Sequence, residues 1–352
     1  MTDLDALVEQ ATRSELFTSP RLAADLRRFL EDHRPAALAL AAEARERGIT
    51  SVFFTGSGGS WSAMYSGKYL ADRFTTLTTD AALSYELIWR NPRRLGPEAM
   101  VFAASYSGET EDTVAALRHA KAAGAWTVGV ANRADSTIAT EADTAIAYES
   151  SALYALPMAV VSLFALEWGR LEGDPQAAEV LAAFDALPDI IAAAYETSRA
   201  TSLDLARRFL PAQELYCVGA GPLYGLAYKF ALTVFMENIR THGSVVESAE
   251  FRHGPAEMLE RQRPNMVFLL GTDESRDMTQ RSLDTAVANG AQVIVYDGAD
   301  HPGLHPLLTP FVLKVPLQWF VVHSALLRGI LDLDDRVFMG RNVLSRGGAR
   351  WP

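Results

Sequence analysis

Cysteine is nearly absent from this sequence, since Cys217 is the only one among 352 residues. A single thiol forms no internal disulfide and builds no cysteine metal site. Cys217 lies in the apolar run LYCVGAG, where a cysteine behaves as a small hydrophobic side chain. We therefore expect Cys217 to be buried in the core, in a chain suited to the reducing cytoplasm.

Positive charge is also scarce. The chain carries 32 Lys and Arg against 43 Asp and Glu, which gives a formal net charge of −11. A nucleic-acid partner is not expected, because binding phosphates in a duplex requires a basic face. A small anionic ligand stays open, because it needs only a local cluster of hydrogen-bond donors.

Long uncharged apolar runs and metal motifs are missing as well. No run of 18 apolar residues is free of charge, so neither a membrane-spanning helix nor a membrane partner is expected. The N-terminus, MTDLDALVEQ, lacks the apolar segment of a signal peptide. The seven histidines show no metal-ligand spacing such as HExxH, and the turn GSGGS is not GxGxxG. We expect no metal and no cofactor.

The sequence does contain a regular alternation of short apolar strands, polar turns and helices. After a helical segment at 3–48, strand, glycine turn and helix follow at 49–74, and the same order begins again at Met100. Such alternation builds a parallel sheet with helices on both faces. The fold class is therefore α/β.

The second half of the chain repeats the plan of the first. MVFAASYSGET, which begins at Met100, and MVFLLGTDESR, which begins at Met266, take matching places. We predict an internal duplication: two similar lobes, each a flavodoxin-like α/β/α sandwich. The N-terminal helices and the first lobe are expected at 1–198, and the second lobe with a C-terminal tail at 199–352.

The turn SYSGET, Ser105 to Thr110, is suited to binding a phosphate. It follows the strand MVFAA and precedes a helix, whose first N–H groups are unpaired and favour an anion. Three hydroxyl groups add donors without adding charge, and Gly108 lets the backbone approach closely. The ordinary alternative is a helix cap made by Ser107 or Thr110.

A second unusual stretch is VVESAEFRHGPAEM, residues 245–258, which crowds ionisable side chains against Gly254 and Pro255. Gly-Pro interrupts regular structure, so His253 should lie on a loop, where a scaffold presents reactive groups. Histidine titrates near neutral pH and can move protons. Glu237 lies on an apolar helix, in ALTVFMENI.

Together these motifs resemble the sugar isomerase (SIS) family over about residues 45–345. The closest likeness is to the fructoselysine 6-phosphate deglycases, through GAGPLYGLAYK, THGSVVESAEFRHGP and GTDESR. The resemblance implies a catalytic pair, Glu237 and His253. It also implies a set of phosphate-binding residues: Ser60, Ser105, Tyr106, Ser107 and Thr110.

Two departures separate this chain from the isomerase half of glucosamine-6-phosphate synthase, the next most similar relative. That enzyme carries an N-terminal cysteine nucleophile, whereas this chain begins Met-Thr. It also has a lysine three residues before its catalytic glutamate, where this chain has Val234. Amination driven by glutamine is therefore not expected, and the deglycase branch fits better.

The resemblance implies cleavage of an amino-ketose (Amadori, fructosamine-type) 6-phosphate to an aldose 6-phosphate and an amine. It also implies a homodimer or higher homo-oligomer, in which His253 completes the neighbouring subunit's active site. Two alternatives stay open: an aldose–ketose or amino-sugar phosphate isomerase or deaminase, and a non-catalytic sugar-phosphate sensor. The roles of six further residues are not assigned: Glu247, Glu250, Arg252, Arg276, His301 and His305.

Overall fold

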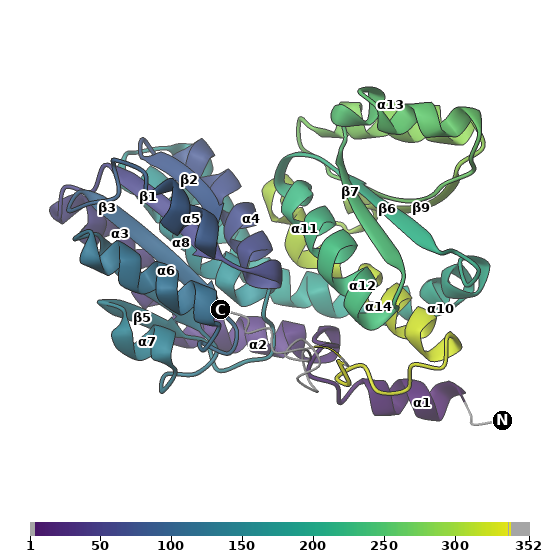
Figure 1. Ribbon diagram of the computed structural model, residues 1–352, viewed down its shortest axis with the longest axis horizontal. Coiled ribbons are helices and arrows are strands. Elements are labelled where there is room, and N and C mark those ends of the chain that lie inside the picture. Colours follow the sequence, from purple (N-terminus) through teal and green to yellow (C-terminus); the bar gives the residue numbers. More distant parts are fainter. Residues whose placement is uncertain (1–3, 337, 339–352) are drawn as a thin grey trace. The chain divides into compact units, whose positions relative to one another are not determined.

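The computed structural model describes residues 4–336 and 338 (Figure 1). They form two compact units, which we call the first unit, Ala24–Pro188, and the second unit, Met1–Ala23 with Asp189–Pro352. These units differ from the expected domains in where residues 1–23 and 189–198 belong, and the expected division at 198/199 stays a prediction. The expected C-terminal tail after residue 338 lies outside the described residues.

The first unit contains a five-stranded parallel sheet in the order β2-β1-β3-β4-β5. This is the flavodoxin-like order, as the repeated strand-turn-helix pattern predicted. The strands are β1 Ser51–Gly56, β2 Thr78–Leu83, β3 Ala99–Ser105, β4 Trp126–Ala131 and β5 Thr144–Ala147. The helices are α3 Arg34–Glu46, α4 Gly58–Phe74, α5 Ser84–Arg90, α6 Glu111–Ala122, α7 Thr137–Glu141, α8 Ala155–Leu171, α9 Pro175–Ala183 and η1 Phe184–Ala186, with α2 Ser19–Asp32 crossing the boundary to the second unit.

Helices cover both faces of this sheet, because successive strand residues point to opposite sides. On one face Phe102 stacks on Phe54 and meets Phe164 of α8 edge-on, with ring centroids 5.5 and 5.2 Å apart. On the other face Phe53 and Val101 pack with residues of α5 and α6. The strands β1, β3 and β4 are therefore buried along their whole length.

The second unit contains a four-stranded parallel sheet in the order β7-β6-β8-β9. Its strands are β6 Glu214–Gly219, β7 His242–Glu247, β8 Asn265–Leu270 and β9 Gln292–Asp297. Its helices are α1 Leu4–Ala11, α10 Leu187–Arg208 (which crosses the boundary), η2 Gly221–Leu223, α11 Tyr224–Tyr228, the π-helical turn η3 Lys229–Val234, α12 Phe235–Asn238, η4 Glu250–Arg252, η5 Pro255–Glu260, α13 Arg276–Ala288, η6 Gly298–Asp300, η7 Pro306–Leu308 and α14 Thr309–Leu327.

The two sheets confirm the predicted pair of similar lobes. The order β7-β6-β8-β9 corresponds strand for strand to β2-β1-β3-β4. In the second unit α13 covers one face of the sheet, and α11 and α14 lie on the other face (Figure 1). Cys217 is fully buried in β6, as expected for a small core side chain.

Two edge strands, β2 and β7, were not predicted. Their sequences, TTDAAL and HGSVVE, are polar or small, and several of their side chains are half-buried or exposed. An edge strand buries less surface than a central one, so it lacks the apolar run that makes a central strand recognisable. The stretch 245–258 therefore begins in β7, and its Gly-Pro break falls between η4 and η5.

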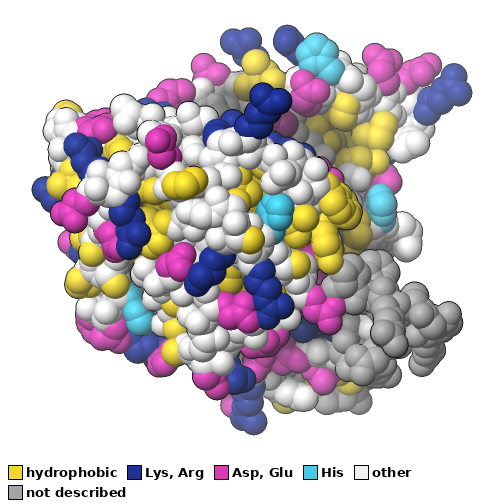
Figure 2. Space-filling model, turned by 60° about the vertical axis from the view of Figure 1, so that its left-hand side comes forward, with side chains coloured by type: hydrophobic (Ala, Val, Ile, Leu, Met, Phe, Trp, Pro, Cys, Tyr) yellow, Lys and Arg dark blue, Asp and Glu magenta, His cyan; other side chains and the backbone are white. Residues whose placement is uncertain are grey.

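Within the described part of the chain, one helical segment, Pro306–Leu327, is long and apolar enough by composition to cross a membrane. In its most apolar 18-residue stretch, 94% is buried inside the structure, as in a core helix. On the face drawn in Figure 2, acidic and basic side chains are interspersed. That face offers no continuous basic patch of described side chains for nucleic acid.

Candidate active site

The two glycine- and serine-containing turns of the first unit lie side by side. They follow β1 and β3, which are paired in parallel with Gly56 opposite Ala104. Because parallel strands end at the same edge of a sheet, the turn after Gly56 and the turn after Ser105 are neighbours. A Cβ atom on Gly56 would lie 2.8 Å from the carbonyl oxygen of Ala104, so the close approach requires glycine.

The hydroxyl groups of the serine loop, Ser105–Thr110, converge as the sequence predicted. The Oγ of Ser105 lies 2.7 Å from the Oγ1 of Thr110 and accepts a hydrogen bond from the Gly108 N–H at 3.0 Å. Ser107 Oγ lies 3.4 Å from Ser105 Oγ and 3.5 Å from Thr110 Oγ1. Gly108 has a φ of +71°, which allows the chain to turn back here.

The helix that follows this loop is not capped by a side chain. Thr110 is the N-cap residue of α6, and among the described residues no side-chain hydrogen bond satisfies the first N–H groups of the helix. Thr110 is exposed, and its hydroxyl is directed to Ser105 rather than to the helix. Neither Ser107 nor Thr110 therefore caps α6, and the first backbone N–H groups of this helix can donate to an anion.

Tyr106, within the serine loop, and Ser60, on the neighbouring turn, complete the expected phosphate-binding set. Ser60 is buried in the first turn of α4, which begins in the glycine turn after β1. Tyr106 is half-buried, and its carbonyl accepts a hydrogen bond from the Asn132 N–H at 3.1 Å. The five expected phosphate-binding residues thus lie on two turns that share one edge of the first sheet.

Sequence reasoning missed a contact that joins these two turns. Ser57 Oγ donates to the Asp112 carboxylate at 2.5 Å, so the start of α4 is linked to the start of α6. Ser84 and Thr113, both fully buried, continue this network with hydroxyls 3.0 Å apart. An aspartate two residues beyond a hydroxyl-rich loop was the available signal, but nothing local identifies its partner.

Glu237 and His253 belong to the second unit. Glu237 is half-buried in the short helix α12, directly after the π-helical turn η3. His253 is exposed on the turn between η4 and η5, which confirms its predicted place on a loop. The Nε of Arg252 lies 3.0 Å from His253 Nε2 and donates to it.

The residues without an assigned role mostly bind locally. The Glu247 carboxylate accepts from the N–H groups of Ala249 and Glu250 at 2.7 and 3.1 Å. His305 Nδ1 accepts from the Leu307 N–H at 3.2 Å. Burial lowers the pKa of His301, against the opposing charges of two nearby aspartates.

Arg276 occupies the position in the second lobe that corresponds to the start of α6. Its two Nη atoms contact both carboxylate oxygens of Asp297 at 2.7 and 2.6 Å, and Nη1 also donates to the Gly271 carbonyl at 2.7 Å. Arg276 is therefore held in an ion pair with Asp297. This turn is filled by its own charged side chains, whereas the serine loop carries neutral hydroxyls.

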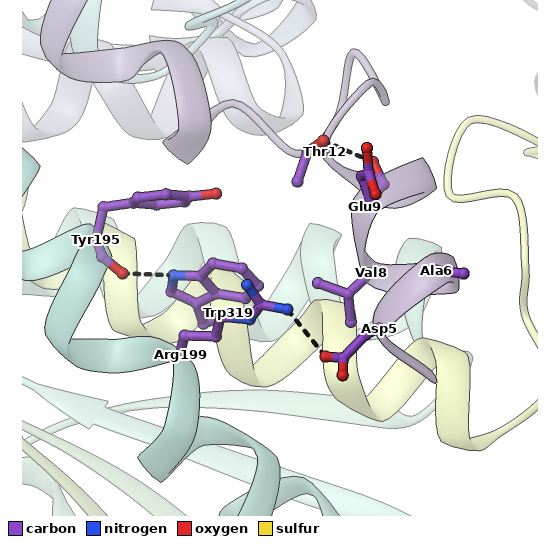
Figure 3. Close-up of a pocket in the computed structure, with 8 residues that line it drawn as sticks. All are labelled: Asp5, Ala6, Val8, Glu9, Thr12, Tyr195, Arg199 and Trp319. Carbon is purple, nitrogen blue, oxygen red and sulfur yellow. Dashed lines mark hydrogen bonds and ion pairs between the residues drawn. The ribbon is translucent and has the colours of Figure 1, made fainter. Parts of the chain in front are cut away.

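A separate pocket of about 410 Å³ lies in the second unit, between α1, α10 and α14 (Figure 3). Tyr195 stacks on Trp319 with ring centroids 5.1 Å apart, and Arg199 contacts Asp5 at 3.0 Å. The pocket is lined by none of the expected site residues. Its arginine is already paired with a carboxylate, so the pocket is poorly suited to a phosphate.

Comparison with known proteins identifies the family. The SIS domain matches residues 47–167, most of the first unit. A fructoselysine 6-phosphate deglycase of Escherichia coli strain K12 is 32% identical over 335 residues, which cover 95% of this chain and 98% of that protein. The chain belongs to the SIS family. The family resemblance predicted from the motifs is confirmed.

Two further comparisons agree with this result. A glutamine–fructose-6-phosphate aminotransferase of Caulobacter vibrioides is 29% identical over 311 residues, or 81% of this SIS protein and 50% of the aminotransferase. The crystal structure of a Bacillus subtilis protein assigned to the phosphosugar isomerases has a TM-score of 0.79 at 26% identity, covering 87% of this chain and 96% of that one. Glucosamine-6-phosphate synthase is another name for this aminotransferase. The more distant likeness to its isomerase half, predicted from the sequence, is thus also confirmed.

Proposed function

We propose that this SIS protein cleaves an amino-ketose 6-phosphate of the fructosamine type into an aldose 6-phosphate and an amine. The observation that carries the proposal is the 32% identity to a fructoselysine 6-phosphate deglycase along nearly the whole of both chains. The converging hydroxyls of Ser105, Ser107 and Thr110 support a phosphate-bearing substrate.

In the proposed reaction a proton moves from C1 to C2 of the sugar. Glu237 takes a proton from C1, and the C2 carbonyl oxygen receives one, which gives an enaminol. A proton then returns to C2, and the C1–N bond becomes an imine. Water adds to the imine and the C–N bond breaks, so one water is consumed and an amine and an aldehyde are released. His253 serves as the acid and base at the sugar oxygens.

The phosphate is anchored by the serine loop, which includes Tyr106, and by Ser60 on the neighbouring turn. Hydroxyls and helix N–H groups bind an anion without adding charge, which suits a group of the substrate that does not react. We also propose that the protein acts in the cytoplasm as a homodimer or higher homo-oligomer. The exposed turn that carries His253 supports this, because an exposed side chain can complete a neighbouring subunit's site.

The test is a panel of ketosamine 6-phosphates that differ in the amine, with release of aldose 6-phosphate as the readout. Turnover should require the 6-phosphate, and a Glu237→Gln variant should lose about 10²–10⁴-fold in kcat, as expected for a positioned base. Binding of the phosphorylated substrate should change little, because the serine loop is intact. Near wild-type turnover by Glu237→Gln, or equal turnover of unphosphorylated ketosamines, would refute the assignment.

A further inference from the structure

Two lysines are buried in the second unit. Lys229, the first residue of η3, is 6% exposed, and Lys314 of α14 is 1% exposed. A buried ammonium is unfavourable unless other groups compensate for the lost hydration. The surroundings of the two lysines differ, and this difference assigns them different roles.

Lys314 is held by neutral oxygens. Its Nζ donates to Thr18 Oγ1 at 2.5 Å and to Gln318 Oε1 at 3.0 Å. Burial lowers its pKa well below the usual value, and the positive charges of Lys229 and Arg21 lower it further. Gln318 also accepts from the Ser19 N–H at 3.0 Å, so this network fastens the segment at 18–19 to α14.

Lys229 lies within the electrostatic influence of a carboxylate, that of Glu237. Burial lowers its pKa to about 8, and the negative charge of Glu237 opposes that shift. A lysine with this pKa is still about 90% protonated at pH 7. Near neutral pH, Lys229 is therefore a buried cation. The negative charge that favours it is that of Glu237, the expected catalytic base.

The π-helical turn gives this pairing its geometry. In an α-helix two turns take about seven residues, so residues eight apart are offset by about 80° around the helix axis. A π turn is closed by i→i+5 hydrogen bonds and adds one residue to the helix. Because η3 spans Lys229–Val234, Lys229 and Glu237 come to share one face although they are eight residues apart. Thr233 Oγ1 donates to the Lys229 carbonyl at 2.7 Å within this turn.

We infer that Lys229 is a positioning residue for Glu237 and that its ammonium orients the Glu237 carboxylate. The inference rests on the proposed function, since Glu237 acts as a base only in that reaction. The charge that acts on Lys229 is that of Glu237, whereas Lys229 and Arg21 both act on the buried Lys314. The π turn η3 places Lys229 on the same face of the helix as Glu237, two turns further along.

Activity provides the first test. Lys229→Met should lower kcat for a ketosamine 6-phosphate by about ten- to a hundredfold with KM nearly unchanged, the effect of losing one interaction with a charged group. Lys229→Arg, which keeps the charge, should recover part of the loss. The matched control is Lys314→Met, which removes a buried lysine that is not aligned with Glu237 and should keep kcat.

The pH profile separates positioning from a general structural effect. In wild-type protein kcat should fall as pH rises through about 8, because the Lys229 ammonium loses its proton. Lys229→Met should lack this alkaline limb. Lys314→Met should keep it, because the charge that acts on the Lys229 ammonium is that of Glu237. An unchanged alkaline limb in Lys229→Met would overturn the inference.

A second test needs no substrate. The pKa of Lys229 is lower in the folded chain than the unfolded value of about 10.4, so between about pH 8 and 10.4 the unfolded chain binds more protons and the free energy of unfolding rises with pH. Lys229→Met should remove this share of the rise. Glu237→Gln removes the negative charge that raises the pKa of Lys229. In this variant the free energy of unfolding should therefore begin to rise at lower pH than in wild type.

The two tests distinguish the inference from the proposed function. If Glu237→Gln leaves the onset of the rise unchanged, the two side chains are not coupled and the inference fails, whatever the substrate. If the stability curves show the coupling but no ketosamine 6-phosphate is cleaved, the pairing stands and the proposed reaction is refuted. The measurement on Glu237→Gln remains decisive even if a Lys229 variant folds poorly.

Discussion

Gly108 determines the shape of the serine loop, and replacing it by alanine tests how closely that loop is packed. Its φ of +71° lies in the left-handed region, and an added Cβ atom would collide with the Oγ and Cβ of Ser136. Gly48 provides a matched control in the same unit. Its φ is +70°, and a Cβ there would meet nothing within 4 Å. Gly48→Ala therefore measures backbone strain alone.

The expected magnitudes follow from these contacts. A left-handed backbone costs an L-residue about 1–2 kcal/mol, so Gly48→Ala should lower the free energy of unfolding by that amount. Gly108→Ala adds the displacement of Ser136, whose hydroxyl donates to the Arg133 carbonyl at 2.7 Å. Loss of that hydrogen bond adds about 1 kcal/mol. The total for Gly108→Ala is then about 2–3 kcal/mol.

Urea unfolding of the two variants measures the difference, and KM for a sugar phosphate measures the effect on the loop. Gly108→Ala should raise KM, whereas Gly48→Ala should leave it unchanged. Ser136→Gly removes the colliding atoms, so in a Ser136→Gly background the added cost of Gly108→Ala should fall to that of Gly48→Ala. Equal losses in the two single variants would show that the loop has room to spare, and the packing argument would be wrong.

Three further predictions concern the second unit. Arg276→Met leaves the Asp297 carboxylate without its partner, and urea unfolding at pH 7 should show a loss of about 1–3 kcal/mol. Burial is the largest influence on the pKa of Asp297 and raises it, but the hydrogen bonds from Arg276 and the Ala299 N–H and the charges of Arg276 and His301 together lower it. The loss in Arg276→Met should therefore shrink as pH falls below about 4. Burial raises the pKa of the Cys217 thiol, so a thiol reagent should label it only after unfolding; rapid labelling of the native protein would contradict its place in β6. Mixing Glu237→Gln with His253→Asn subunits should restore some activity if sites are shared, and no recovery after proven subunit exchange would refute sharing.

The serine loop was predictable because its signal is local. Three hydroxyls and a glycine between an apolar strand and a helix define a turn with free donors, and the structure brings Ser105, Ser107 and Thr110 together as expected. The two-lobe fold was predictable for a similar reason, since the same strand-turn-helix pattern occurs twice. Edge strand β2 was missed because its TTDAAL sequence is not an apolar run.

The relation between Lys229 and Glu237 could not be predicted, because it depends on one extra residue in a helical turn. Helical periodicity offsets residues eight apart by about 80°, and no residue type marks a π turn as glycine marks a left-handed one. The contact between Ser57 and Asp112 was missed for a different reason. It joins positions 55 residues apart, and the pairing of β1 with β3 brings their turns together.

The two lobes share a fold but differ in the charge at corresponding turns. The turn after β3 offers neutral hydroxyls, whereas the turn after β8 contains Asp273 and the pair of Arg276 with Asp297. A phosphate dianion would meet two carboxylates at the second turn and would have to displace an arginine already held in three hydrogen bonds. The duplicated turn is thus unsuited to a second anchor. If the proposed reaction is right, phosphate binding stays with the first lobe, and the second lobe is left to supply the proton-transfer groups.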